Sequence, residues 1–181
     1  DSRVSRGLGD VYKRQEPLVP APAELLSVPI GEVMIDATKE ELVVTSNTED
    51  EKLVSIEAFK GIRFAQAERF EHSAPVALAD LLNSEGIINA TSFGNACPQN
   101  KSTNFGAGLK LEQSEDCLNL NIWRPEGTTE LDDLPVYVFI HGGDFEYGTG
   151  ANPMIHGDTV VAQGADAVSY THLTLPTTPV V

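Results

Sequence analysis

The chain has 181 residues, of which 41% are hydrophobic, and 12 basic against 27 acidic side chains give a formal net charge of −15. This length and composition suit a globular domain with a sizeable core, and no apolar run approaches the roughly 18 residues of a membrane span. The acidic excess argues against nucleic acid or an anionic membrane as a partner.

The two ends of the chain differ from its middle. The segments SRGLGDVYKRQ, which ends at Gln15, and VSYTHLTLPT, which begins at Val168, resemble translations of transposase adapters used to prepare sequencing libraries. A DNA sequence that encodes part of the first segment can be the reverse complement of one that encodes part of the second segment. We therefore expect residues 1–15 and 168–181 to be artefacts, and residues 16–167 to be natural sequence whose true termini are both missing.

The first half of the natural part is rich in β-strand signals. Three runs of β-forming residues within residues 27–65, separated by polar turn-prone stretches, predict an antiparallel meander. The spacing of Leu78, Leu81 and Leu82 then predicts a helix. Residues 89–116 are rich in Gly, Asn and Ser, which predicts a long ordered loop.

Two strands and a short helix follow the loop. In DCLNLNIWRP the leucines and Ile122 alternate with the asparagines and Trp123, which predicts a strand with two distinct faces. The apolar run Val136–Ile140 favours a strand covered on both faces. GDTVVAQG predicts a helical turn or two that Asp158 caps and Gly164 ends. The order predicts an α/β fold, with antiparallel first strands leading into a mixed central sheet, cut off early.

The apolar run ends in a turn, His141-Gly142-Gly143, that can carry chemistry. Glycine lacks Cβ, so the backbone can adopt unusual angles and approach a substrate closely. Two N–H groups aimed at one point stabilise an oxyanion, and losing one such donor typically costs about 2.7–4 kcal/mol. Taken alone, however, a His-Gly-Gly turn is more often a strand end with glycines for steric reasons.

The neighbouring motifs change that interpretation. AFKGIRFAQAERF, ATSFGNACPQ, SEDCLNLNIWRP and LPVYVFIHGGDFEYGTG, followed by HGDTVVAQG, closely resemble segments of the type-B carboxylesterase family in the same order. This family includes cholinesterases and bile-salt lipases, and the resemblance covers about Gly31 to Ala167. It implies an α/β-hydrolase fold and hydrolysis of small-molecule or lipid esters through an acyl-enzyme, with no cofactor and no metal.

The resemblance assigns a role to each residue of the turn. Gly143 and Asp144 would supply oxyanion-hole N–H groups, Gly142 would shape the turn, and His141 would support it without acting as general base. The family usually has glycine or alanine where this chain has Asp144. That carboxylate would oppose catalysis if it were buried facing the site, and would be tolerated if it were turned away or paired.

The resemblance also implies two structural pairs. Cys97 and Cys117, the only two cysteines, would form a disulfide, and Arg69 and Glu115 would form an ion pair at the base of the loop. A disulfide points to an oxidising compartment, so we expect a secreted or extracellular protein.

Other single residues carry weaker signals. Asn89 in Asn-Ala-Thr and Asn100 in Asn-Lys-Ser match the N-glycosylation pattern. His72 and His156 belong to no partner pattern and are expected at the surface or in loops. Arg63 stands where the family usually has proline, so the resemblance does not determine the path of the backbone in this loop.

The nucleophile expected beside an oxyanion turn is missing. No serine of the chain lies in a G-x-S-x-G pattern, and in the family this elbow follows the turn well downstream, ahead of the acid and the histidine. We therefore expect the chain as given to be an inactive fragment of a serine esterase. An alternative is a fragment of a catalytically silent, neuroligin-like adhesion or binding protein, in which the glycine turn is often altered.

Overall fold

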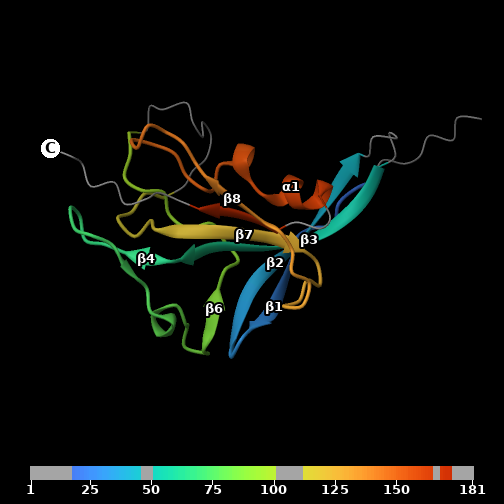
Figure 1. Ribbon diagram of the computed structural model, residues 1–181, viewed down its shortest axis with the longest axis horizontal. Coiled ribbons are helices and arrows are strands. Elements are labelled where there is room, and N and C mark those ends of the chain that lie inside the picture. The colour runs from blue at the N-terminus through green and yellow to red at the C-terminus, as the bar shows by residue number, and fades with distance from the viewer. Residues whose placement is uncertain (1–17, 46–50, 101–111, 165–167, 173–181) are drawn as a thin grey trace, which may run out of the picture.

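The computed structural model describes residues 18–45, 51–100, 112–164 and 168–172 (Figure 1). The predicted artefact at residues 1–15 lies outside the described residues, as does most of the one at residues 168–181. Among the residues described, no helix is long and apolar enough to cross a bilayer.

One large mixed sheet organises the chain. Its main strand order is β1-β2-β3-β7-β9-β8, with β6 paired to β2. The pairs β2–β6 and β8–β9 are parallel and the others are antiparallel. The strands are β1 (Glu24–Ile30), β2 (Val33–Thr45), β3 (Glu51–Arg63), β6 (Ile87–Asn89), β7 (Asn119–Pro125), β8 (Val136–Ile140) and β9 (Val168–His172). The predicted antiparallel meander leading into a mixed sheet is therefore present.

Smaller elements complete the described part. Two short strands, β4 (Ala65–Gln66) and β5 (Ala74–Pro75), pair with each other. The helix α1 (Asp158–Gln163) packs against β2, β3 and β7 and covers one face of the sheet (Figure 1). Two 3-10 turns span Leu78–Asp80 and Pro153–Ile155.

The core has two halves because successive residues of a strand point to opposite faces. Ile56 and Ala58 of β3 pack with Trp123 and with Val161 of α1 on one face, and all four side chains are buried. Phe59, the next residue of β3, packs with Ile35 of β2 and other apolar side chains on the opposite face. β3 is thus buried on both sides.

A bulge in β3 lies beside the loop that follows β6. The pairing of β3 with β7 shifts register between Phe59 and Ile62. Gly61 adopts a φ of +72°, and a Cβ at this position would lie 2.4 Å from the carbonyl oxygen of Ser92. Only glycine fits such a bulge beside another backbone segment.

The helix predicted from Leu78, Leu81 and Leu82 is wrong. Only a 3-10 turn forms at Leu78–Asp80, while Leu81 and Leu82 lie half-buried against the second half of the core. The side chain of Asn83 accepts the N–H groups of two residues that follow it, at 2.9 Å each. This local turn competes with helix formation, as asparagine side chains commonly do.

The helix α1 differs from its prediction at one end. Gly164 ends it as expected, donating its N–H to Val160. Asp158 is the first helical residue rather than the cap, and its carboxylate instead accepts the N–H of Thr159 at 2.6 Å.

Val136–Ile140 forms the predicted strand, but within the described chain it is not covered on both faces. β8 pairs only with β9 and is the outermost strand of the sheet. Val136, Tyr137, Val138 and Ile140 are each at least half exposed. The apolar run reflects a strand suited to burial, but no described element packs over it. β9, on its inner side, falls within the segment that the sequence marks as adapter-like.

An exposed apolar edge strand is a site of self-association, and lysine at such an edge opposes pairing. We predict that Val138→Lys raises the protein concentration at which the chain begins to self-associate, measured by sedimentation velocity. The matched control is Leu131→Lys, which adds the same charge at a residue 91% exposed and outside any strand. Equal effects of the two substitutions would contradict a role for the β8 edge.

Candidate functional site

The turn after β8 folds back on itself around one carbonyl group. The oxygen of Gly143 accepts the N–H groups of Glu146 at 2.9 Å and Tyr147 at 3.1 Å. Gly143 has a φ of +135°, and Asp144 and Phe145 follow with φ values of +55° and +62°. Two consecutive non-glycine residues at positive φ are uncommon, and such conformations concentrate at functional sites.

The turn leaves backbone donors available. Among the described residues, no acceptor takes the N–H groups of Gly143 and Asp144. Gly142 and Asp144 are exposed, and Phe145 is 84% exposed. Two adjacent N–H groups at an exposed strand end can accept a negatively charged oxygen supplied from outside the turn.

Sterics explain which glycines the turn needs. A Cβ on Gly143 would lie 1.8 Å from the carbonyl oxygen of Tyr147, and one on Gly148 would lie 2.6 Å from Nδ1 of His141. A Cβ on Gly142 would meet no atom within 4 Å. Gly143 and Gly148 are therefore required by the path of the chain, whereas Gly142 is not.

His141 belongs to the scaffold of the turn. Its Nδ1 lies 2.8 Å from the carbonyl oxygen of Gly142. A carbonyl oxygen can only accept, so Nδ1 carries the proton in this hydrogen bond. Nε2 is buried and has no hydrogen-bond partner among the described residues. This arrangement agrees with a supporting role for His141 and gives its ring no proton-transfer partner in the described chain.

Two carboxamide side chains hold the far end of the turn. Gln99 accepts the N–H of Gly148 at 2.9 Å and donates to the carbonyl oxygens of Gly148 at 2.8 Å and Cys97 at 3.1 Å. Asn121 of β7 donates to the carbonyl of Gly150 at 3.2 Å. The family motifs in the sequence do not identify either residue as part of the site.

Asn121 also connects the turn to the bulge of β3. Its side-chain oxygen accepts the N–H of Gly61 at 2.9 Å, and the residue is fully buried. The asparagines that alternate with leucines along β7 are the one sequence signal for this role, because buried amides must find partners.

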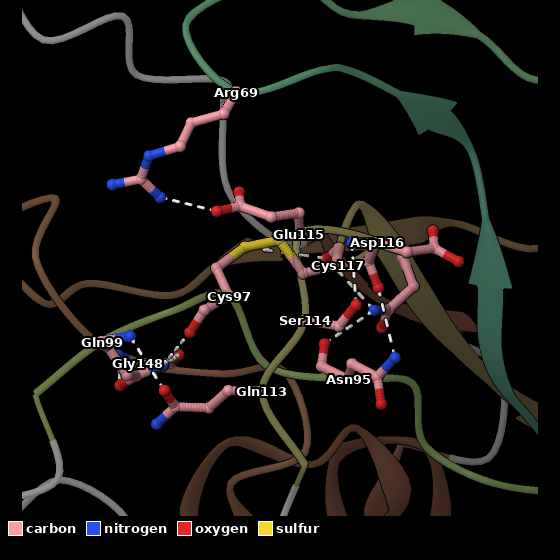
Figure 2. The surroundings of a disulfide bond; sticks show 11 residues. Arg69, Asn95, Cys97, Gln99, Gln113, Ser114, Glu115, Asp116, Cys117 and Gly148 are labelled. Carbon is pink, nitrogen blue, oxygen red and sulfur yellow. Dashed lines mark hydrogen bonds and ion pairs between the residues drawn. A yellow bond between two sulfur atoms is a disulfide. The ribbon is translucent and has the colours of Figure 1, made fainter.

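The disulfide places Gln99 against the turn (Figure 2). Cys97 and Cys117 are bonded to each other with their Cα atoms 5.0 Å apart and a sequence separation of 20. Cys117 lies just before the first residue of β7, Asn119, so the disulfide joins the loop that carries Gln99 to the central sheet. In the chain-entropy model, closing a loop of this size stabilises the fold by about 3 kcal/mol.

Arg69 and Glu115 also lie together beside the disulfide (Figure 2), with Nη1 and Oε1 2.6 Å apart. Both side chains are more than half exposed, so the pair contributes little to stability. Arg63 lies 3.3 Å from Asp116 in a second ion pair of the same region. These two ion pairs lie at the base of the loop, and no described contact joins them to the turn after β8.

His156 packs against aromatic side chains of the core. It lies in a loop, one of the two expected locations, but it is half-buried there: its ring stacks on Phe93 with centroids 4.8 Å apart and on Trp123 at 5.5 Å. Its Nε2 donates to the carbonyl of Ala151 at 3.2 Å. His156 thus fastens the segment after the turn onto the aromatic core, while His72 is exposed as expected.

Electrostatic shifts occur away from the turn. The hydrogen bond from Lys39 lowers the pKa of the Glu126 carboxyl, and the same bond raises the pKa of Lys39. Backbone and side-chain hydrogen bonds from Thr129 lower the pKa of Asp132. The described residues contain no group of three or more His, Cys, Asp or Glu side chains that could hold a metal ion.

The mixed sheet and the glycine turn at a strand end together define part of an α/β-hydrolase. Residues 44–169 match the model of the carboxylesterase family, and the chain belongs to this family.

Several relatives give the scale of the match. The para-nitrobenzyl esterase of Bacillus subtilis (strain 168) is 41% identical over 81 residues, which cover 44% of this chain and 16% of that protein. A secreted lipase of Arthroderma benhamiae is 41% identical over 112 residues, covering 60% and 19%. The cholinesterase of Mus musculus is 32% identical over 151 residues, covering 74% and 23%. The chain spans about a fifth of the length of these relatives.

Solved structures agree with the sequence comparisons. A thermophilic PNB esterase superposes with a TM-score of 0.58 at 28% identity, covering 81% of this chain and 27% of that one. A further PNB esterase structure gives the same values.

The steric contrast between the two turn glycines gives a direct test. We predict that Gly143→Ala lowers the free energy of unfolding by about 1–3 kcal/mol, because the turn must abandon its strained path. It should also speed amide exchange at Glu146 and Tyr147, which donate to Gly143. Gly142→Ala is the matched control and should leave both quantities unchanged. The account of the turn fails if the two substitutions behave alike in urea unfolding and hydrogen exchange.

Proposed function

We propose that the chain is part of a serine carboxylic-ester hydrolase and contributes its oxyanion turn. The observation that carries the proposal is the pair of adjacent N–H groups on Gly143 and Asp144, without an acceptor among the described residues, at the end of β8. The family match supports the esterase class. The nucleophile, acid and base would come from sequence other than this chain, which is therefore inactive alone.

The chemistry of the turn follows from acyl transfer. A serine oxygen attacks the ester carbonyl carbon while a histidine takes its proton, and the carbonyl π electrons move onto the oxygen. The N–H groups of Gly143 and Asp144 would bind that oxygen as its charge develops. The alcohol then leaves with a proton from the histidine, and water hydrolyses the acyl-enzyme by the same route. No cofactor is required.

Asp144 can be accommodated in this mechanism. Its side chain is exposed, and aspartate tolerates the left-handed backbone conformation better than most residues. The backbone N–H would serve the oxyanion while the carboxylate remains in water, where its charge is screened. The same substitution is the one observation that favours the alternative, a catalytically silent adhesion or binding protein.

The substrate and the compartment are proposed from the relatives and the disulfide. Matching proteins are named para-nitrobenzyl esterase, bile salt-activated lipase and cholinesterase, which supports a small-molecule or lipid ester as substrate. A relative named as a secreted lipase and the Cys97–Cys117 bond support an extracellular location, since disulfides persist in oxidising compartments.

The proposal predicts no turnover of a short-chain nitrophenyl ester by the chain alone. Sequencing the source locus outward from the codons for Gly150 should extend the frame into a G-x-S-x-G elbow. In that extended protein, the clash of a Cβ at residue 143 with the Tyr147 carbonyl would displace the turn and withdraw an N–H donor, so Gly143→Ala should lower kcat by about 10²–10³. Gly142→Ala should change it little.

Three results would decide against the proposal. A frame with the serine replaced would favour the silent protein. Turnover by the chain alone that Gly143→Ala abolishes would show that the nucleophile is already present. An extended enzyme indifferent to Gly143→Ala would remove the turn from the mechanism.

A further inference from the structure

The Asn89-Ala90-Thr91 triplet crosses from the end of β6 into the following loop. Asn89 is exposed, while Ile88 before it and Ala90 after it are buried at 9% and 0% exposure. Asn89 is paired with Asp36 of β2, and Asp36 is paired with Ser27 of β1. Residues opposite each other on neighbouring strands share a face of the sheet. Asn89 therefore ends a polar row on the face that β6 and β2 present to solvent.

The side chain of Asn89 is held in one orientation by Thr91. Its Oδ1 accepts the N–H of Thr91 at 3.1 Å and the hydroxyl of Thr91 at 2.9 Å. With Oδ1 turned toward Thr91, the Nδ2 amide lies on the other side and makes no hydrogen bond among the described residues. An exposed asparagine with a threonine two residues later is the acceptor pattern for N-glycosylation.

We propose that Asn89 is a site of N-linked glycosylation and that the glycan covers the β1 margin of the sheet. The inference rests on the extracellular location in the proposed function. Nδ2 attacks the anomeric carbon of an oligosaccharide linked to a lipid diphosphate. The C–N bond forms, the C–O bond to the diphosphate breaks, the lipid diphosphate leaves, and the amide gives up one proton to a base of the transferring enzyme.

The surroundings of Asn89 suit a sugar. A shallow depression beside Thr91 is lined by Leu25, Leu26, Ser27, Asp36 and Thr91, which combine apolar surface with hydroxyl and carboxylate oxygens. Leu25 is 78% exposed on β1, the outer strand at this side of the sheet. Exposed strand edges promote aggregation unless they are covered or charged. A glycan rooted at Asn89 covers this edge.

The experiment expresses the chain behind a secretory leader in eukaryotic cells. Peptide N-glycosidase converts a glycosylated asparagine to aspartate, and peptide mass spectrometry then locates the conversion. The variants are Asn89→Gln, Thr91→Ala, Thr91→Ser and Asn100→Gln. Asn100 is the matched control because it belongs to the second acceptor triplet of the chain.

Conversion at Asn89 is expected in the parent chain, in Thr91→Ser and in Asn100→Gln, and it should vanish in Thr91→Ala. Asn89→Gln should lose the corresponding glycan mass. An unconverted Asn89 in secreted chain, or conversion only at Asn100, would overturn the inference. Because the leader forces secretion, that failure would leave the esterase proposal intact. Conversely, an inactive extended protein would leave the glycosylation result standing.

Discussion

The geometry of the turn after β8 depends on side-chain amides that hydrogen-bond to its backbone. Gln99 makes two hydrogen bonds to Gly148, and Asn121 makes one to Gly150, so the far end of the turn is fixed from two directions. Gln99 is held beside the turn by the Cys97–Cys117 bond two residues away and by the hydrogen bond of its own N–H to Gln113, and Asn121 is fixed within β7. Removing either amide would leave buried polar groups without partners, at a cost of about 1–3 kcal/mol each.

The chemistry proposed for the turn requires that this scaffold hold the N–H donors in place. Donors that are already in place stabilise a developing oxyanion without reorganising at the moment of reaction. The N–H groups of Gly143 and Asp144 would be in place because His141 and the required glycines fix the path of the turn. The departure at Asp144 alters the side chain at this point but leaves the backbone donor, which is the group that the proposed chemistry would use.

Sequence patterns predicted the parts of the molecule that depend on local or pairwise rules. The strands, the end of α1 at Gly164 and the membership of the carboxylesterase family all follow from such patterns. The failures arise where distant segments decide. The helix predicted around Leu81 does not form, because the side chain of Asn83 accepts backbone N–H groups in a local turn instead. β8 lies exposed because no described element packs over it. The role of Gln99 depends on a contact 49 residues away in sequence, which no local pattern reveals.

Hydrogen exchange at the Gly148 amide tests the central claim most directly. Its N–H donates to Gln99, so Gln99→Leu should speed its exchange, and so should reduction of the disulfide in the unmodified chain. Amides of β3 such as that of Ile56, in the core of the sheet, should keep their protection in both cases. Unchanged protection at Gly148 after both treatments would contradict the account, because the turn would then be held by something other than Gln99 and the disulfide.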